Sequence, residues 1–217
     1  MSDVFSEAAS WLSDGSHWSG VDGVPHRLVE HVAYTALTVG IAAAIALPLG
    51  LWIGHTGRFR GLAVALTGAL RALPTLGVLT WMVLWQGVGL TPATVALVVL
   101  AVPPLLAGAY SGLESVDRAT IDAARAIGMT EWQILIKVEI PLALDLILGG
   151  VRSAVLQVVA TATIAAYIGL GGLGRYLIDG IAVRDYAQML SGSIVIVVLA
   201  LVLDGLFALV QRRTAHP

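Results

Sequence analysis

Four glycines in the stretch "YIGLGGLGRYL" have a spacing that occurs in nucleotide-binding turns. They are Gly169, Gly171, Gly172 and Gly174, and they contain the pattern G-x-G-x-x-G. Such a turn binds a dinucleotide only when a strand precedes it, a helix follows it and an acidic residue comes about 20 positions later. Here the preceding segment is apolar and long enough to span a membrane, and no Asp or Glu occurs between Asp185 and Asp204. We therefore predict a tight backbone turn at a membrane face rather than a cofactor site.

A second stretch, "DRATIDAARAIGMTEWQILIKVEIPLAL", is suited to docking rather than to catalysis. Its small residues at helical spacing are Ala119, Ala123 and Ala126. Gly128 is placed to end this helix in a left-handed conformation. Thr130, with Gln133 three residues later, predicts the N-cap of a second helix, and Pro141 stands where that helix enters the bilayer. A short helix with a smooth face favours insertion into a groove of a cytoplasmic partner.

Several residues and motifs on which enzymes rely are missing from this chain. It has no cysteine, which excludes disulfides, thiolate metal sites and Cys nucleophiles, and its five histidines lack a metal-ligand spacing. Lys137 is the only lysine, so the chain has no P-loop, and any ATP must be hydrolysed by another polypeptide. The net charge of −2 gives no basis for nucleic-acid binding. We predict no catalytic residue, no metal site and no cofactor in this chain.

The composition identifies the environment in which these segments lie. Hydrophobic residues make up 58% and charged residues 12% of the 217 residues, against about 45–50% and about 25% in globular chains. So few charges cannot cover the surface of a water-soluble fold, so the chain is predicted to be an integral membrane protein. Segments of about 20 apolar residues predict five spanning helices. They are residues 32–53, 61–85 (broken by Pro74), 92–113 (kinked by Pro103 and Pro104), 140–168 and 189–210.

Basic residues predict the orientation of these five spans. They lie after the first span, after the third span and in the tail, at Arg58, Arg60, Arg118, Arg125, Lys137, Arg212 and Arg213. The positive-inside rule then gives an external N-terminus and a cytoplasmic C-terminus. We expect an external segment at 1–27 with a possible interfacial helix, a five-span domain at 28–213 with a cytoplasmic loop at 114–139, and a tail at 214–217.

Charged residues within the spans are the candidates for a transport pathway. At about 1.5 Å per residue, Arg71 and Arg152 lie near the midplane, whereas Asp145 and Asp204 lie closer to the cytoplasmic end. Such charges face protein or water rather than lipid. We favour an ion pair between an arginine and Asp145 or Asp204; the alternative is an arginine that meets a substrate carboxylate. The candidate pathway or gate residues are Arg71, Pro74, Arg152, Gly169, Gly171, Gly172 and Gly174.

The loop at 114–139 resembles the "EAA" loop of permease subunits of binding-protein-dependent ABC importers. That pattern is E-A-A, three residues, Gly, and Leu-Pro twelve and thirteen positions later. The matching residues, with Asp for Glu and Ile for Leu, are Asp122, Ala123, Ala124, Gly128, Ile140 and Pro141. "LRALPTLGVL" and "ATATIAAYIGLGGLGRYLIDGI" extend the similarity to the osmoprotectant branch, which imports glycine betaine, carnitine or choline. The resemblance implies an all-α, type I ABC importer permease fold in which the six matching residues couple the chain to the ATPase.

The resemblance also implies the partners and the location. Two permease chains, identical or related, would pair in the bacterial cytoplasmic membrane with two ATPase subunits, which bind ATP and Mg, and with an external solute-binding protein. Three alternatives remain at this point. The same fold can serve another small solute, such as ergothioneine or an amino acid. An ion-coupled secondary transporter would need carboxylates near the midplane, and a membrane-embedded enzyme would need nucleophile–base or metal-ligand pairs in the spans.

Overall fold

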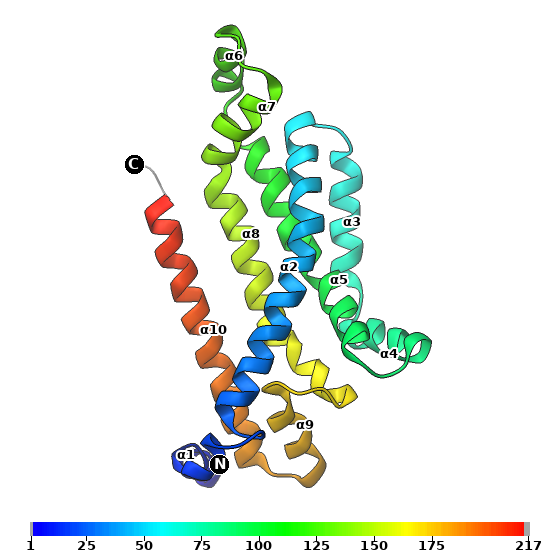
Figure 1. The fold of residues 1–217 in the computed structure, drawn as a ribbon, viewed down its shortest axis with the longest axis vertical. Coiled ribbons are helices and arrows are strands. Elements are labelled where there is room, and N and C mark those ends of the chain that lie inside the picture. Colours follow the sequence, from blue (N-terminus) through cyan, green and yellow to red (C-terminus); the bar gives the residue numbers. More distant parts are fainter. Residues whose placement is uncertain (1, 215–217) are drawn as a thin grey trace. The chain divides into compact units, whose positions relative to one another are not determined.

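A computed structural model describes residues 2–214 of the chain, and every regular element in that range is helical. In chain order the elements are α1 (Ser2–Ser13), η1 (Gly15–Trp18), α2 (Val24–Thr56), α3 (Arg60–Ala72), α4 (Thr75–Gln86), α5 (Leu90–Glu114), α6 (Arg118–Ala126), α7 (Glu131–Ile134), η2 (Leu135–Glu139), α8 (Ile140–Thr161), η3 (Ala162–Ile168), α9 (Gly174–Val183) and α10 (Tyr186–Thr214) (Figure 1). The predicted all-α class is confirmed.

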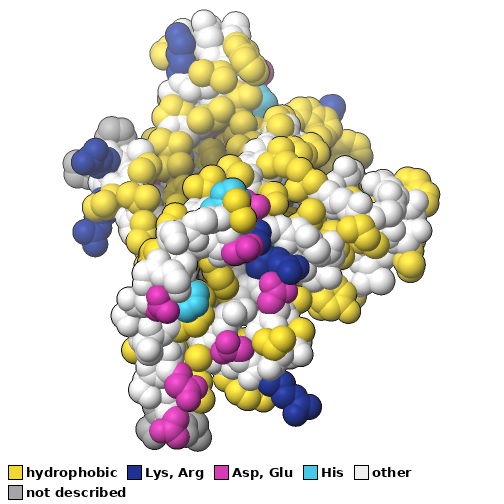
Figure 2. Space-filling model, turned by 60° about the horizontal axis from the view of Figure 1, so that its bottom comes forward, with side chains coloured by type: hydrophobic (Ala, Val, Ile, Leu, Met, Phe, Trp, Pro, Cys, Tyr) yellow, Lys and Arg dark blue, Asp and Glu magenta, His cyan; other side chains and the backbone are white. Residues whose placement is uncertain are grey.

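Three of these helices, α2, α5 and α10, are long and apolar enough to cross a membrane. Helices α3 and α4 add a fourth candidate if they form one span, bent by 82° at the break that contains Pro74, where the sequence predicts it. Helix α5 continues through Pro103 and Pro104. Large apolar side chains are exposed along α2, α3, α4 and α10, and Figure 2 shows hydrophobic groups over much of the visible surface. The count of five spans and their orientation stay predictions.

The helices form two compact units, which are described separately. Unit 1 comprises Met1–Val39, Pro74–Val98 and Val155–Asp204, and unit 2 comprises Gly40–Leu73, Val99–Ala154 and Gly205–Pro217. Unit 2 contains the loop with the EAA-like pattern, and unit 1 contains the glycine turn.

In unit 2, helices α2, α5 and α8 approach one another at glycines. A Cβ atom added to Gly50 of α2 would lie 2.6 Å from the Cβ of Ala109 on α5. A Cβ added to Gly108 of α5 would lie 2.7 Å from the Cα of Gly150 on α8. Small residues allow such close helix packing in membranes. Gly50 and Gly108 are each followed by another glycine four residues later, at Gly54 and Gly112. We did not predict a role for this G-x-x-x-G spacing from the sequence.

In unit 1, helix α1 packs against the rest of the unit. Ala8 is 1% exposed, and its carbonyl accepts a hydrogen bond of 3.2 Å from the hydroxyl of Ser191 on α10. The ring of Trp11 stacks on His17 and meets the edge of Tyr176 on α9. The predicted helix near the N-terminus is thus present, and part of its apolar face covers protein.

Candidate functional site

Helix α6 is delimited by the local signals that its sequence contains. The Asp117 carboxylate caps its start by accepting a hydrogen bond of 3.1 Å from the backbone N–H of Ala119. At its end Gly128 has a φ of +86°, and its N–H donates to the carbonyl of Arg125 at 2.9 Å. A left-handed glycine after the last helical turn is a common helix ending. The left-handed helix end predicted at Gly128 is confirmed.

The two alanines of the EAA-like pattern point in different directions. Ala123 is exposed, together with Ala119 and Ala126, so the predicted small-residue face is open to a partner. Ala124 is only 6% exposed and belongs to an apolar cluster that includes Ile121 and Ile134. Successive helical residues are about 100° apart, because a turn takes 3.6 residues, so two adjacent alanines can lie in different environments. The structure therefore places Ala124 inside unit 2.

Two further features of α6 lie on its exposed side. Ile127, at the C-cap, is 80% exposed, which is unusual for an aliphatic side chain that ends a helix. Asp122, the acid of the pattern, is also exposed and lies 3.3 Å from Arg125. The alanine face, Ile127 and Asp122 together form a surface that combines an apolar centre with a charged edge.

The second helix of the loop begins as predicted. The hydroxyl of Thr130 accepts from the N–H of Gln133 at 3.4 Å, and the side chain of Gln133 accepts from the N–H of Thr130 at 2.9 Å. These two bonds form a capping box. The chain then continues through η2 into α8, where the N–H of Ile140 donates to Leu135, five residues back. Pro141 has no N–H to donate, which accounts for the wider turn before it.

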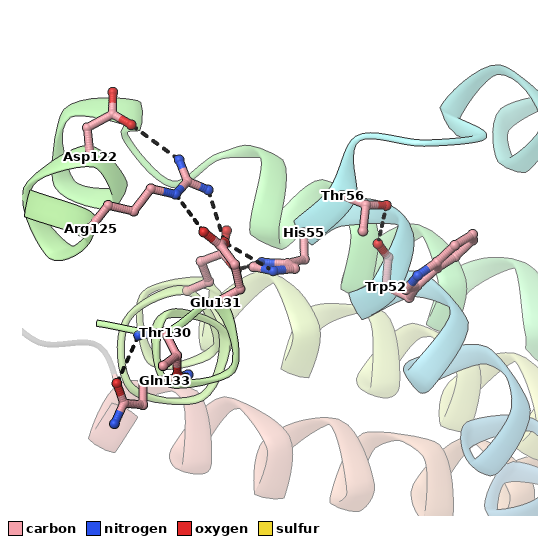
Figure 3. Close-up of polar contacts among 9 residues, drawn as sticks. Trp52, His55, Thr56, Asp122, Arg125, Thr130, Glu131 and Gln133 are labelled. Atoms are coloured by element: carbon pink, nitrogen blue, oxygen red, sulfur yellow. Dashed lines mark hydrogen bonds and ion pairs between the residues drawn. The ribbon is translucent and has the colours of Figure 1, made fainter. Parts of the chain in front are cut away.

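Arg125 joins α6 to α7 through a two-point ion pair. Its Nε donates to Glu131 Oε1 at 2.8 Å and its Nη2 donates to Glu131 Oε2 at 3.1 Å (Figure 3). These hydrogen bonds lower the pKa of the Glu131 carboxyl and raise the pKa of Arg125. A parallel pair of this kind fixes the relative angle of the two groups as well as their distance.

His55, at the end of α2, lies between two acids of the loop. Its Nε2 is 3.5 Å from Glu131 Oε2 (Figure 3), and its Nδ1 is hydrogen-bonded to Glu139. The side chains of His55 and Glu139 are 15% and 4% exposed. Neither residue has a role that we predicted from the sequence. The available signal was Glu139 itself, an acid directly before the apolar start of α8.

The glycine turn is a packed structural element of unit 1. Gly169 and Gly172 have φ values of +81° and +89°, and the N–H of Gly172 donates to Glu30 Oε2 on α2 at 2.8 Å. A Cβ on Gly171 would overlap the same carboxylate, and Gly174 lies against the backbone of η3. A helix rather than a strand precedes the turn. A dinucleotide-binding turn requires a strand at this place, and Glu30 is a contact of the turn that the sequence did not reveal.

The remaining pathway candidates lie in separate places. Arg71 is in the last turn of α3, and Pro74 is the N-cap of α4. Arg152 Nη1 donates to Gln211 on α10 at 3.0 Å, and Gln211 in turn donates to the backbone carbonyl of Asp145 at 3.3 Å. Gln211 thus connects the two charged positions of α8. The role of these residues in a pathway stays a prediction.

Comparisons with known proteins identify the family of this chain. Residues 46–216 match the family described as binding-protein-dependent transport system inner membrane component. The chain is 37% identical over 190 residues to the osmoprotectant import permease protein OsmW of Salmonella typhimurium, covering 84% of this chain and 87% of the relative. It is 33% identical over 184 residues to the carnitine transport permease protein OpuCB of Listeria monocytogenes, covering 85% and 84%.

Solved structures of ABC transporters share the fold. An inward-facing form of the MetNI methionine ABC transporter aligns with a TM-score of 0.77 at 23% identity, covering 87% of this chain and 94% of the other. An amino acid ABC transporter with histidines aligns with a TM-score of 0.68 at 23% identity, covering 86% and 91%. The chain therefore belongs to the family of binding-protein-dependent inner membrane components, and it is the multi-pass permease subunit of an ABC importer.

Proposed function

We propose that this permease moves a compact quaternary-ammonium osmoprotectant, such as glycine betaine, carnitine or choline. The support comes from relatives whose names state these substrates and which align with most of this chain. One is the glycine betaine/carnitine/choline transport system permease protein OpuCB of Bacillus subtilis, 31% identical and covering 87% of both chains.

The proposed assembly contains two permease chains, two ATPase subunits and a solute-binding protein. Each permease chain has five spans, with its N-terminus outside and the loop at 114–139 in the cytoplasm. ATP and Mg bind to the ATPases, because this sequence has no P-loop. The small side chains of Ala123 and Ala126 let α6 lie close to the walls of a groove on the ATPase, and the exposed side chain of Ile127 can fill an apolar pocket in that groove. The exposed face of α6 carries this proposal.

Reconstitution tests the substrate. The permease, its ATPase and its binding protein are inserted into liposomes, and uptake of labelled glycine betaine, carnitine, choline, ergothioneine and methionine is measured with and without ATP. We expect ATP-dependent uptake of at least one of the first three compounds. Uptake of only methionine or ergothioneine would contradict the substrate class but leave the importer assignment intact.

A further inference from the structure

Four charged or titratable side chains of unit 2 join segments that lie far apart in the sequence. Arg125 belongs to α6, Glu131 to α7, His55 to α2 and Glu139 to η2 (Figure 3). Arg125 contacts Glu131, Glu131 contacts His55, and His55 contacts Glu139. We call this set the ion-pair relay. It links α6 to α2, whereas the backbone links α6 directly only to α5 and α7.

The buried end of the relay is held firmly. Glu139 is 4% exposed at its side chain, and a buried carboxylate without a partner is costly. His55 supplies that partner. Both ring nitrogens of His55 face carboxylate oxygens, one of Glu139 and one of Glu131, so this one side chain contacts both acids.

The exposed end of the relay lies on the helix that is proposed to dock. Between α6 and α7 the backbone turns at Gly128, which has no neighbour within 4 Å of a Cβ position and so does not brace the turn by side-chain packing. Arg125 spans this turn by its two-point contact with Glu131. A displacement of α6 is thus passed to Glu131, which also touches the histidine of α2.

We propose that the ion-pair relay transmits movement of α6 to the end of α2, with Glu131 as the positioning residue at its centre. The proposal rests on the proposed docking of the ATPase at α6. It adds that the first long helix is driven through side chains, in parallel with the path along the chain through η2 into α8. Asp122 supports the exposed end, since it contacts the same guanidinium at 3.3 Å.

Charge reversal in the complete transporter tests the relay. We compare Arg125→Glu, Glu131→Arg and the double variant, measuring substrate uptake, co-purification of the ATPase and stimulation of ATP hydrolysis by loaded binding protein. Each single variant should retain the ATPase but lose about fivefold in uptake, since attraction is replaced by repulsion in an ion pair that is partly exposed to solvent. The double variant restores an Arg–Glu pair between α6 and α7 but places an arginine beside His55, so it should recover only part of this loss. His55→Leu should lose at least as much uptake, because it removes the contact with Glu131 and also leaves the buried Glu139 without its partner.

A matched control is Lys137→Glu, which reverses another exposed charge of the same loop and should leave uptake unchanged. Lys137 makes no ion pair within residues 2–214. Full uptake in both single variants would overturn the relay, and so would full uptake in His55→Leu. Failure of the ATPase to co-purify with the wild-type permease would instead contradict the proposed docking, so the two failures can be told apart.

Discussion

Replacing Gly128 isolates the contribution of one backbone angle to coupling. Its φ of +86° is unfavourable for other residues, while a Cβ at this position meets nothing within 4 Å. The cost of a substitution is therefore conformational rather than steric. A left-handed conformation costs about 1–2 kcal/mol for an ordinary L-residue, which corresponds to a factor of about 5–30 in the population of the native turn. Asn tolerates this region, and β-branched residues tolerate it least.

The expected series follows from these costs. Gly128→Asn should keep nearly normal uptake, Gly128→Ala should lose about fivefold, and Gly128→Val should lose about tenfold or more. The assay is ATP-dependent uptake in liposomes at matched amounts of inserted permease, together with the yield of co-purified ATPase. The matched control is Gly87→Val at the C-cap of α4, where φ is +83° and the Cβ position is equally open. It should lower the melting temperature without reducing ATPase co-purification. Equal uptake for all three Gly128 variants would refute the reasoning.

Four further changes have definite expected outcomes. Single cysteines, introduced into a chain that has none, should react with an impermeant reagent from outside at Ser16 and Gly89 and only from inside at Thr56 and Thr214; external labelling at Thr214 would refute the five-span topology. Ala124→Trp should destabilise the core by about 1–3 kcal/mol and lower the melting temperature, whereas Ala123→Trp should keep the melting temperature and block ATPase co-purification. Gly150→Ala should lower the melting temperature, because its Cβ would lie 2.7 Å from the carbonyl oxygen of Pro104. The neighbouring Gly149→Ala should be tolerated, because the atom nearest to its Cβ would be 3.8 Å away. Equal melting temperatures for the two variants would contradict the close packing. The pKa of the Glu131 carboxyl is lowered, so its ion pair with Arg125 should persist at every pH above the ordinary Glu pKa of about 4.3 and be lost only below that pH. The distance between spin labels on α6 and α7 should therefore stay constant from about pH 8 to 5.

Local signals in the sequence predicted the local features of the site. Gly128, the capping box at Thr130 and the break at Pro74 each follow from the chemistry of one or two residues and their neighbours. The direction of Ala124 was also available, since Ile121 lies three residues before it and marks the buried face of the helix.

Contacts between distant segments were not predictable in this way. His55 and Glu139 are 84 residues apart, and Glu30 and Gly172 are 142 apart. No residue type or spacing in one sequence specifies such a pair, because each partner alone is an ordinary polar residue at the end of an apolar segment. Only the packing of the helices brings them together.

The glycine contacts of unit 2 limit how α2, α5 and α8 can move relative to one another. Where Gly108 of α5 meets Gly150 of α8, backbone touches backbone, so no side chain lies between the helices to change rotamer and absorb a displacement. The same holds where Gly50 of α2 meets Ala109 of α5, apart from one methyl group. Sliding of one helix along another would force atoms into overlap. The helix segments around these glycines should therefore move together, so a displacement that the ion-pair relay transmits to the end of α2 should also reach α5 and α8.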